Sequence, residues 1–213
     1  MVRKQAVDYR LCLVTDRETV KGRDLGRCVA AAIKGGVTMV QVREKTASSL
    51  AFFETAKRLK ALTDRYQLPL IINDRLDIAL ATEADGLHLG QTDLPLLVAR
   101  NILGAKKLIG VSVATVREAR LAEKQGADYL GVGAMFPTPS KQDAQPVTVA
   151  TLQAIKAAVD IPVVAIGGIG PDNVDSVMTA GIDGVAIISA VLKADDCRQA
   201  AAKLLALVTK HLR

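Results

Sequence analysis

The sequence has few of the residues on which several common kinds of site depend. Its 213 residues include no tryptophan, two histidines and three cysteines, and only 3% are aromatic. Cys12, Cys28 and Cys197 are odd in number and far apart in sequence, which argues against a disulfide framework and a zinc knuckle. Cys12 falls in an apolar strand-like run and Cys28 in a helix-like run, and both are predicted to be buried thiols. The chain has no Ser-His-Asp order and no histidine cluster, so hydrolytic and zinc chemistry are not expected.

Long apolar segments and dense basic runs are also missing. Residues 1–8 are short and polar, with no signal-peptide core, and the apolar run 185–192 is interrupted by Ser189 and too short to span a bilayer. We therefore expect a cytoplasmic protein with no membrane partner. The formal net charge is +6, but no basic run is dense or interleaved with aromatic residues, so nucleic-acid binding is not expected. The charge is compatible with small phosphorylated substrates.

Aliphatic residues are abundant, and half of the chain is hydrophobic, which is typical of a parallel sheet buried on both faces. Short β-branched runs alternate with longer helical patterns. The expected strands are 10–15, 38–43, 70–73, 86–89, 108–112, 129–133, 163–166 and 185–188. The expected helices are 24–34, 48–66, 76–82, 94–103, 115–125, 148–159, 172–180 and 195–210, with a further short helix at 190–193.

Eight strands alternating with eight helices predict parallel βαβ units with right-handed crossovers. The phrases "GGVTMVQVR", "QGADYLGVG" and "AGIDGVAII" repeat one helix-glycine-strand pattern, and no linker interrupts the alternation. We expect an α/β fold, a single (β/α)8 TIM barrel over 1–213 with an N-terminal extension at 1–8. The alternative is an open doubly wound sheet, which usually has five or six strands and a glycine-rich first turn; the turn at 16–24 lacks G-x-G-x-x-G.

In a barrel, the active site lies at the carboxyl ends of the strands. Polar residues or glycines follow nearly every expected strand, which predicts one site at that end. The candidates are Gln41, Arg43, Glu44, Lys45, Asn73, Asp74, Arg75, His88, Gln91, Asp93, Ser112, Thr138, Ser140, Lys141, Gly167, Gly168, Ile188 and Ser189.

Two aspartates at this end indicate a magnesium site. Asp74 and Asp93 follow neighbouring strands, so their carboxylates can converge, and Mg²⁺ is commonly held by one or two carboxylates together with substrate phosphates. The alternative is that each aspartate caps the helix that follows it. The nearby cations Arg43 and Lys45 favour the metal interpretation.

Two anion-binding regions are predicted beside the aspartates. Arg43, Lys45 and Lys141 converge from two strands and suit a diphosphate, although Lys45 or Lys141 alone would be ordinary surface charge. Gly167 and Gly168, with Ser189 and the short helix after it, suit a phosphate, as loops after strands seven and eight often do in barrels. The glycine pair alone would equally fit a simple turn.

His88 and Ser112 leave more than one interpretation open. His88 lies within an expected strand, where filling of the barrel interior is favoured over proton transfer. Ser112 ends the fifth strand and would either contact a substrate or cap the next helix. His211 belongs to the terminal helix.

Seven motifs occur in order, one at each strand end from the second strand to the eighth: "QVREK", "NDR", "GLHLGQTD", "GVS", "PTPSK", "AIGGI" and "IIS". Together, from Tyr9 onward, they resemble thiamine phosphate synthase. The resemblance implies a transferase of thiamine biosynthesis. It would condense 4-amino-2-methyl-5-hydroxymethylpyrimidine diphosphate with 4-methyl-5-(2-phosphoethyl)thiazole or its carboxylated form, with Mg²⁺ as cofactor, and release diphosphate.

The resemblance also implies roles for individual residues. Asp74 and Asp93 would bind Mg²⁺, and Lys141, Arg43 and Ser112 would be catalytic. The pyrimidine diphosphate would be held by Gln41, Arg43, Lys45, Asn73, Ser112 and Lys141. The thiazole phosphate would be held by Thr138, Ser140, Gly167, Gly168, Ile188 and Ser189.

The sequence departs from the family pattern at two of these motifs. Ser140 stands where the family usually has Thr, which keeps the hydroxyl, and Thr92 stands where Asp is frequent. The resemblance implies that the bond to diphosphate breaks early and that the thiazole nitrogen traps a pyrimidine carbocation, so no protein nucleophile is needed. A separate hypothesis is that the loop 136–146 closes over the site and excludes water. The alternatives are a thiazole tautomerase on the same barrel and a non-catalytic phosphate sensor.

Overall fold

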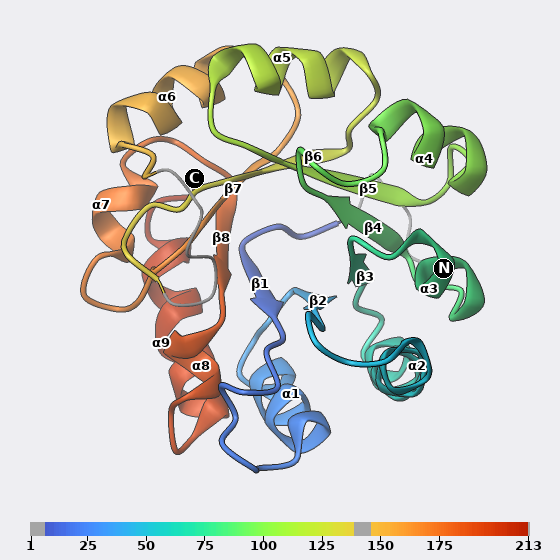
Figure 1. Cartoon of the computed structure of the whole chain (residues 1–213). Helices are drawn as coiled ribbons and strands as arrows, with labels where there is room; N and C mark the ends of the chain where they lie inside the picture. The colour runs from blue at the N-terminus through green and yellow to red at the C-terminus, as the bar shows by residue number, and fades with distance from the viewer. Residues whose placement is uncertain (1–6, 139–145, 213) are drawn as a thin grey trace.

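Strands and helices alternate along the whole of the chain that the computed structural model describes, which is residues 7–138 and 146–212. The strands are all parallel and close into a barrel in the order β1 to β8, with β8 paired back onto β1 (Figure 1). This closed order confirms the predicted (β/α)8 barrel and excludes the open sheet. The strands are β1 Leu11–Val14, β2 Met39–Val42, β3 Leu70–Asn73, β4 Gly86–Leu89, β5 Leu108–Val113, β6 Tyr129–Val132, β7 Val163–Ile166 and β8 Gly184–Ile187.

Helices ring the barrel on its outer side (Figure 1). They are α1 Leu25–Lys34, α2 Ser49–Arg65, α3 Leu76–Ala81, α4 Leu96–Leu103, α5 Val116–Lys124, α6 Val149–Ala157, α7 Val174–Met178, α8 Ser189–Leu192 and α9 Cys197–Thr209. Within residues 7–138 and 146–212, all nine helices match expected ones, and α7 is the most shortened, because a turn at 170–173 precedes it. Within the described part of the chain, no helix is both long and apolar enough to cross a bilayer.

Side-chain capping explains where most of the longer helices begin. Asp24, Ser48, Thr115, Thr148 and Asp196 each accept a hydrogen bond from a backbone N–H in the first turn of α1, α2, α5, α6 and α9 respectively. Such caps satisfy amide groups that have no partner within the helix, and each contributes about 1 kcal/mol.

The hydrophobic core has two layers. The larger layer lies between the strands and the helices and includes the fully buried Leu59, Leu152 and Leu204. The smaller layer fills the inside of the barrel and consists of Cys12, Val14, Met39, Ile71, Leu108, Tyr129, Val164 and Ala186. All three cysteines are buried free thiols, as expected for Cys12 and Cys28, and burial raises the pKa of Cys12 to about 12. The barrel is therefore a filled core whose chemistry must lie at its ends.

At the amino-terminal end of the strands, one hydrogen-bond arrangement occurs four times. The residue before each even-numbered strand accepts, through its side chain, a backbone N–H at the start of the preceding odd strand. The acceptor oxygens belong to Thr38, Asp85, Asp128 and Asp183, and the donors are the amides of Leu11 (3.0 Å), Leu70 (3.0 Å), Ile109 (2.7 Å) and Val163 (2.7 Å). We call these contacts the base locks.

Three of the base locks also contain an ion pair. Asp85, Asp128 and Asp183 receive a cation from the helix that precedes the odd strand, and Thr38 has no charge to pair. The partners are Lys60 of α2 at 3.5 Å, Arg100 of α4 at 2.5 Å and Lys156 of α6 at 2.7 Å. Each charged lock therefore joins a helix to the two strands that follow it.

Candidate active site

The carboxyl ends of β2, β3 and β4 bring together three of the predicted site residues. Lys45 follows β2, and its Nζ lies 2.9 Å from Oδ2 of Asp74, which follows β3. Asp93 follows β4, and its carboxyl lies within hydrogen-bonding reach of the carboxyl of Asp74. The predicted convergence of the two aspartates beside a cation is thus present in the structure.

The environment of Asp93 favours a bound proton or cation. Burial raises the pKa of Asp93, and the adjacent Asp74 carboxyl raises it further, through the hydrogen bond and through its charge. The Gly90 amide, which donates to Oδ2 of Asp93 at 2.7 Å, and the charge of Lys45 act in the opposite direction. Two carboxylates in contact repel each other, so a divalent cation between them would relieve the repulsion.

Neither aspartate caps a helix, so the alternative raised by the sequence is wrong. Arg75 and Pro95 occupy the positions that cap α3 and α4, and neither helix has a side-chain cap. Asp74 has a φ of 62°, a left-handed backbone conformation that is uncommon for a residue other than glycine. The amide of Asp74 donates to the carbonyl of His88 at 2.9 Å, which ties this turn to β4 and turns the Asp74 carboxyl toward Asp93.

The chemistry of the two carboxylates fits Mg²⁺ in a partial site. Among the described residues, no group of three or more His, Cys, Asp or Glu side chains is arranged to hold a metal. Mg²⁺ characteristically takes one or two carboxylates and completes its shell with water and substrate phosphates. Asp74 and Asp93 would supply such a pair, and Lys45 beside them would face the same phosphates.

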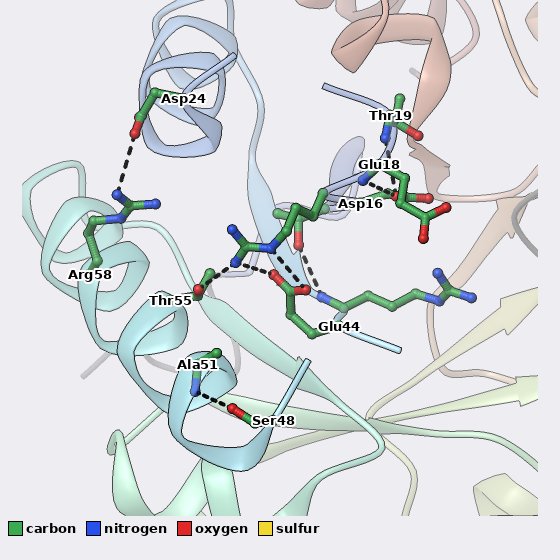
Figure 2. Close-up of polar contacts among 12 residues, drawn as sticks. Asp16, Glu18, Thr19, Asp24, Glu44, Ser48, Ala51, Thr55 and Arg58 are labelled. Atoms are coloured by element: carbon green, nitrogen blue, oxygen red, sulfur yellow. Dashed lines mark hydrogen bonds and ion pairs between the residues drawn. The ribbon is translucent and has the colours of Figure 1, made fainter. Parts of the chain in front are cut away.

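Two other charged residues near this end, Glu44 and Arg75, form ion pairs with residues outside the group of Lys45, Asp74 and Asp93. Glu44 is the neighbour of Lys45, and Figure 2 shows an arginine side chain joined by dashed lines both to Glu44 and to Thr55. Arg17 Nη2 lies 2.9 Å from Glu44 and 2.8 Å from the Thr55 hydroxyl. The Glu44 side chain is only 4% exposed. Arg75 pairs with Asp77 at 2.5 Å. These pairs direct Glu44 and Arg75 away from the carboxylates.

Arg43, Gln41 and Asn73 also lie at this end. The Arg43 amide donates to the hydroxyl of Thr15 at 3.1 Å, which joins the end of β2 to the end of β1. Gln41 is buried within β2, with 5% of its surface exposed, and Asn73 ends β3 opposite His88. All three therefore border the end of the barrel that carries the aspartates.

His88 and Ser112 are joined inside the barrel. His88 is 7% exposed, and its Nε2 lies 2.9 Å from the hydroxyl of Ser112, while its Nδ1 lies 3.0 Å from the hydroxyl of Tyr129. This confirms that His88 fills the barrel. Ser112 does not cap a helix, because Thr115 caps α5.

The second predicted anion region is built by glycines after β7 and by α8 after β8. Gly167 and Gly168 have φ values of 103° and 66°, and a Cβ on Gly168 would lie 2.8 Å from Cβ of Phe136. Both glycines are therefore required by the backbone and by the approach of residues 134–137. Ser189 is the first residue of α8, and Ile188 precedes it.

Two predicted site residues, Ser140 and Lys141, lie outside the described residues, as does most of the expected closing loop. Thr138 is the last described residue before them.

Sequence reasoning missed two residues that shape this end. Asn173 donates to the carbonyl of Gly168 at 3.0 Å and accepts from the amide of Gly170 at 2.8 Å, so it holds the turn after β7. Tyr129 contacts His88 from the start of β6. The signal for Tyr129 was the pair of glycines, Gly110 and Gly131, on the strands beside His88.

The comparisons with known proteins agree on one family. A family model described as thiamine monophosphate synthase matches residues 11–191. The thiamine-phosphate synthase of Alkaliphilus oremlandii is 55% identical over 93% of this chain and 95% of its own length, and that of Clostridium acetobutylicum is 52% identical over 96% and 97%.

Solved structures extend this likeness to the fold. Thiamine phosphate pyrophosphorylase from Pyrococcus furiosus superposes with a TM-score of 0.90 at 42% identity and covers 97% of this chain and 98% of its own. A geranylgeranylglyceryl phosphate synthase from Thermoplasma acidophilum has a TM-score of 0.69 at 16% identity and shares the fold alone. The chain belongs to the thiamine monophosphate synthase family.

Proposed function

We propose that the protein is a thiamine-phosphate synthase. It joins 4-amino-2-methyl-5-hydroxymethylpyrimidine diphosphate to 4-methyl-5-(2-phosphoethyl)thiazole, or to its carboxylated form with loss of the carboxyl group as CO₂. The C–O bond between the pyrimidine methylene and diphosphate breaks, diphosphate leaves with the bonding electrons, and the thiazole nitrogen forms the new C–N bond. The observation that carries the proposal is the contact of Lys45, Asp74 and Asp93, in a chain 55% identical to a synthase.

The leaving diphosphate requires positive charge and no protein nucleophile. Asp74 and Asp93 would hold Mg²⁺, which supplies charge stabilisation to the diphosphate when bound. Lys45, Arg43 and Lys141 add cations from β2 and from the segment after β6. Gln41, Asn73 and Ser112 would hold the pyrimidine, since all three border the same end of the barrel.

The thiazole phosphate would bind on the opposite side of the barrel mouth. Gly167 and Gly168 allow the backbone after β7 to approach an anion closely, and Ser189 adds a hydroxyl at the start of α8. Ile188, Thr138 and Ser140 would complete this region. Holding both substrates in one mouth supplies much of the rate acceleration, because it turns a reaction between two molecules into one within a complex.

The test is formation of thiamine phosphate from the two purified substrates and Mg²⁺, measured by oxidation to a fluorescent thiochrome product. We expect product that requires both substrates, disappears with EDTA and returns when Mg²⁺ is added in excess. A folded protein that binds the thiazole phosphate but forms no product would contradict the proposal and favour the tautomerase or the sensor.

A further inference from the structure

One layer inside the barrel contains two polar rings in contact. In the strand register, His88 of β4 lies beside Gly110 of β5, and Gly110 lies beside Tyr129 of β6. The two rings meet across β5, with centroids 5.5 Å apart and with the Tyr129 hydroxyl 3.0 Å from His88 Nδ1. Neither ring is among the residues assigned to a substrate above.

Two glycines create the space for these rings. A Cβ built on Gly110 would lie 2.1 Å from Cζ of Tyr129 and 2.5 Å from Nδ1 of His88, and one on Gly131 would lie 3.0 Å from Cε1 of His88. Neither glycine has a positive φ, so backbone conformation does not require it. The glycines of β5 and β6 thus leave the space that the rings of His88 and Tyr129 occupy.

The two rings are the middle of a polar chain that crosses the barrel. His88 Nε2 lies 2.9 Å from the Ser112 hydroxyl, and the Gln41 side chain lies near enough to the Tyr129 hydroxyl to lower the pKa of Tyr129. The order is Gln41, Tyr129, His88, Ser112. Gln41 and Ser112, at its two ends, are the residues that the proposed function places against the pyrimidine.

The chain of hydrogen bonds has a direction. A neutral imidazole has one donor and one acceptor nitrogen, and burial raises the pKa of Tyr129 well above its usual value, so its hydroxyl keeps its proton. The tautomer of His88 therefore fixes whether the Ser112 hydroxyl is free to donate or to accept at the barrel mouth. In the same way, a Tyr129 hydroxyl whose donor or acceptor role is fixed by His88 would favour one of the two flip states of the nearby Gln41 amide.

We propose that His88 and Tyr129 are positioning residues that orient Ser112 and Gln41 for a pyrimidine with an amino group beside a ring nitrogen. Such an edge offers one donor next to one acceptor, and a side-chain amide pairs with it in only one flip state, as amides do with adenine. The inference rests on the proposed function and deepens it, because it assigns recognition of the amino group to residues that do not touch the substrate.

The first experiment compares Tyr129→Phe with a matched control, Tyr9→Phe. Tyr9 packs against Tyr129 at the amino-terminal end, with ring centroids 5.3 Å apart and the ring planes tilted by 42°, and it lines a cavity of about 530 Å³ at that end. Each variant removes one hydroxyl and keeps the ring. Steady-state kinetics of the purified full chain give kcat and KM for each substrate, with the natural pyrimidine diphosphate and with its analogue that lacks the amino group.

We expect Tyr129→Phe to lower kcat/KM for the natural pyrimidine diphosphate roughly 10- to 50-fold, because a buried hydrogen-bond partner is lost. Its effect on the deaminated analogue and on KM for the thiazole phosphate should be less than about twofold, as should every effect of Tyr9→Phe. Equal losses toward both pyrimidines, or no loss in a folded variant, would overturn the inference. A wild-type protein that forms no product would overturn the proposed function itself.

A second experiment tests whether Tyr129 acts through Gln41. We expect Tyr129→Phe to have little further effect, below about threefold, in a Gln41→Ala background, because interacting residues are not additive. Full additivity would contradict the inference. His88→Gln keeps an amide near the Ser112 hydroxyl, so it should retain more activity than a His88→Ala variant that has the same melting temperature. This comparison can be made even if Tyr129→Phe fails to fold.

Discussion

At the amino-terminal end of the barrel, Asp128 accepts the amide of Ile109 and pairs with Arg100 at 2.5 Å. At the carboxyl end, Asp93 lies against a second carboxyl, that of Asp74, with Lys45 as the nearby cation. An aspartate at the amino-terminal end is therefore paired with a cation of the fold, whereas an aspartate at the carboxyl-terminal end lies against a second negative charge. A bound cation would relieve this repulsion. We therefore assign stabilisation of the barrel to the amino-terminal end and the proposed chemistry to the carboxyl-terminal end.

The largest expected effect comes from the carboxyl-terminal end of the barrel. Asp93→Asn should lower kcat by roughly 100-fold or more, because the proposed Mg²⁺ on the diphosphate would lose one of its two carboxylate ligands. The melting temperature should stay the same or rise, since the repulsion with Asp74 disappears. The matched control is Asp77→Asn, an exposed aspartate in the first turn of α3, which should keep activity within about twofold. A stable Asp93→Asn variant with normal turnover would break the comparison.

The next effect comes from the base locks. Asp128→Ala should lower the free energy of unfolding by about 2–4 kcal/mol, because it removes the mostly buried carboxylate that both Arg100 and the Ile109 amide contact. Urea denaturation measures this loss. The kcat of the folded variant should be unchanged, so a fall in kcat without a fall in stability would show that the two ends are not separate.

A substitution in the barrel interior, between the two ends, should have an intermediate effect on stability. Gly110→Ala places a methyl group on the rings of Tyr129 and His88 and should cost about 1–3 kcal/mol of stability through overpacking. Combining it with Tyr129→Phe should not restore stability, because the close approach involves the ring and not the hydroxyl. Recovery of stability in the double variant would contradict this account.

The smallest expected effect is on stability, and it compares the uncharged base lock at Thr38 with the charged one at Asp128. Thr38→Val removes the two hydrogen bonds that join its hydroxyl to the amide and the carbonyl of Leu11 without breaking an ion pair, so the expected loss in the free energy of unfolding is about 1 kcal/mol. Thermal unfolding of Thr38→Val beside Asp128→Ala measures the difference. Equal losses would show that the ion pair in the charged locks contributes nothing.

The sequence predicted the strands and helices to within one or two residues at most ends, because β-branched runs, capping residues and glycines mark these ends locally. It also predicted that Asp74 and Asp93 meet, since the ends of neighbouring parallel strands share an edge. It did not separate Glu44 from Lys45, because the partner of Glu44 is Arg17, in a loop whose path depends on packing against α2. Nor did it assign a role to Tyr129, whose contact with His88 depends on the stagger of three strands.

The base locks divide the barrel into repeating two-strand units. Each charged lock lies within one unit: α2 to β4, α4 to β6 and α6 to β8. A circular permutant of these 213 residues that begins just before α4 would keep every lock within a continuous stretch. One that begins between β5 and β6 would split the Asp128 lock. Circular permutants of the first kind should therefore refold more readily than those of the second, and quarter-barrels of this composition are natural building blocks for recombined barrels.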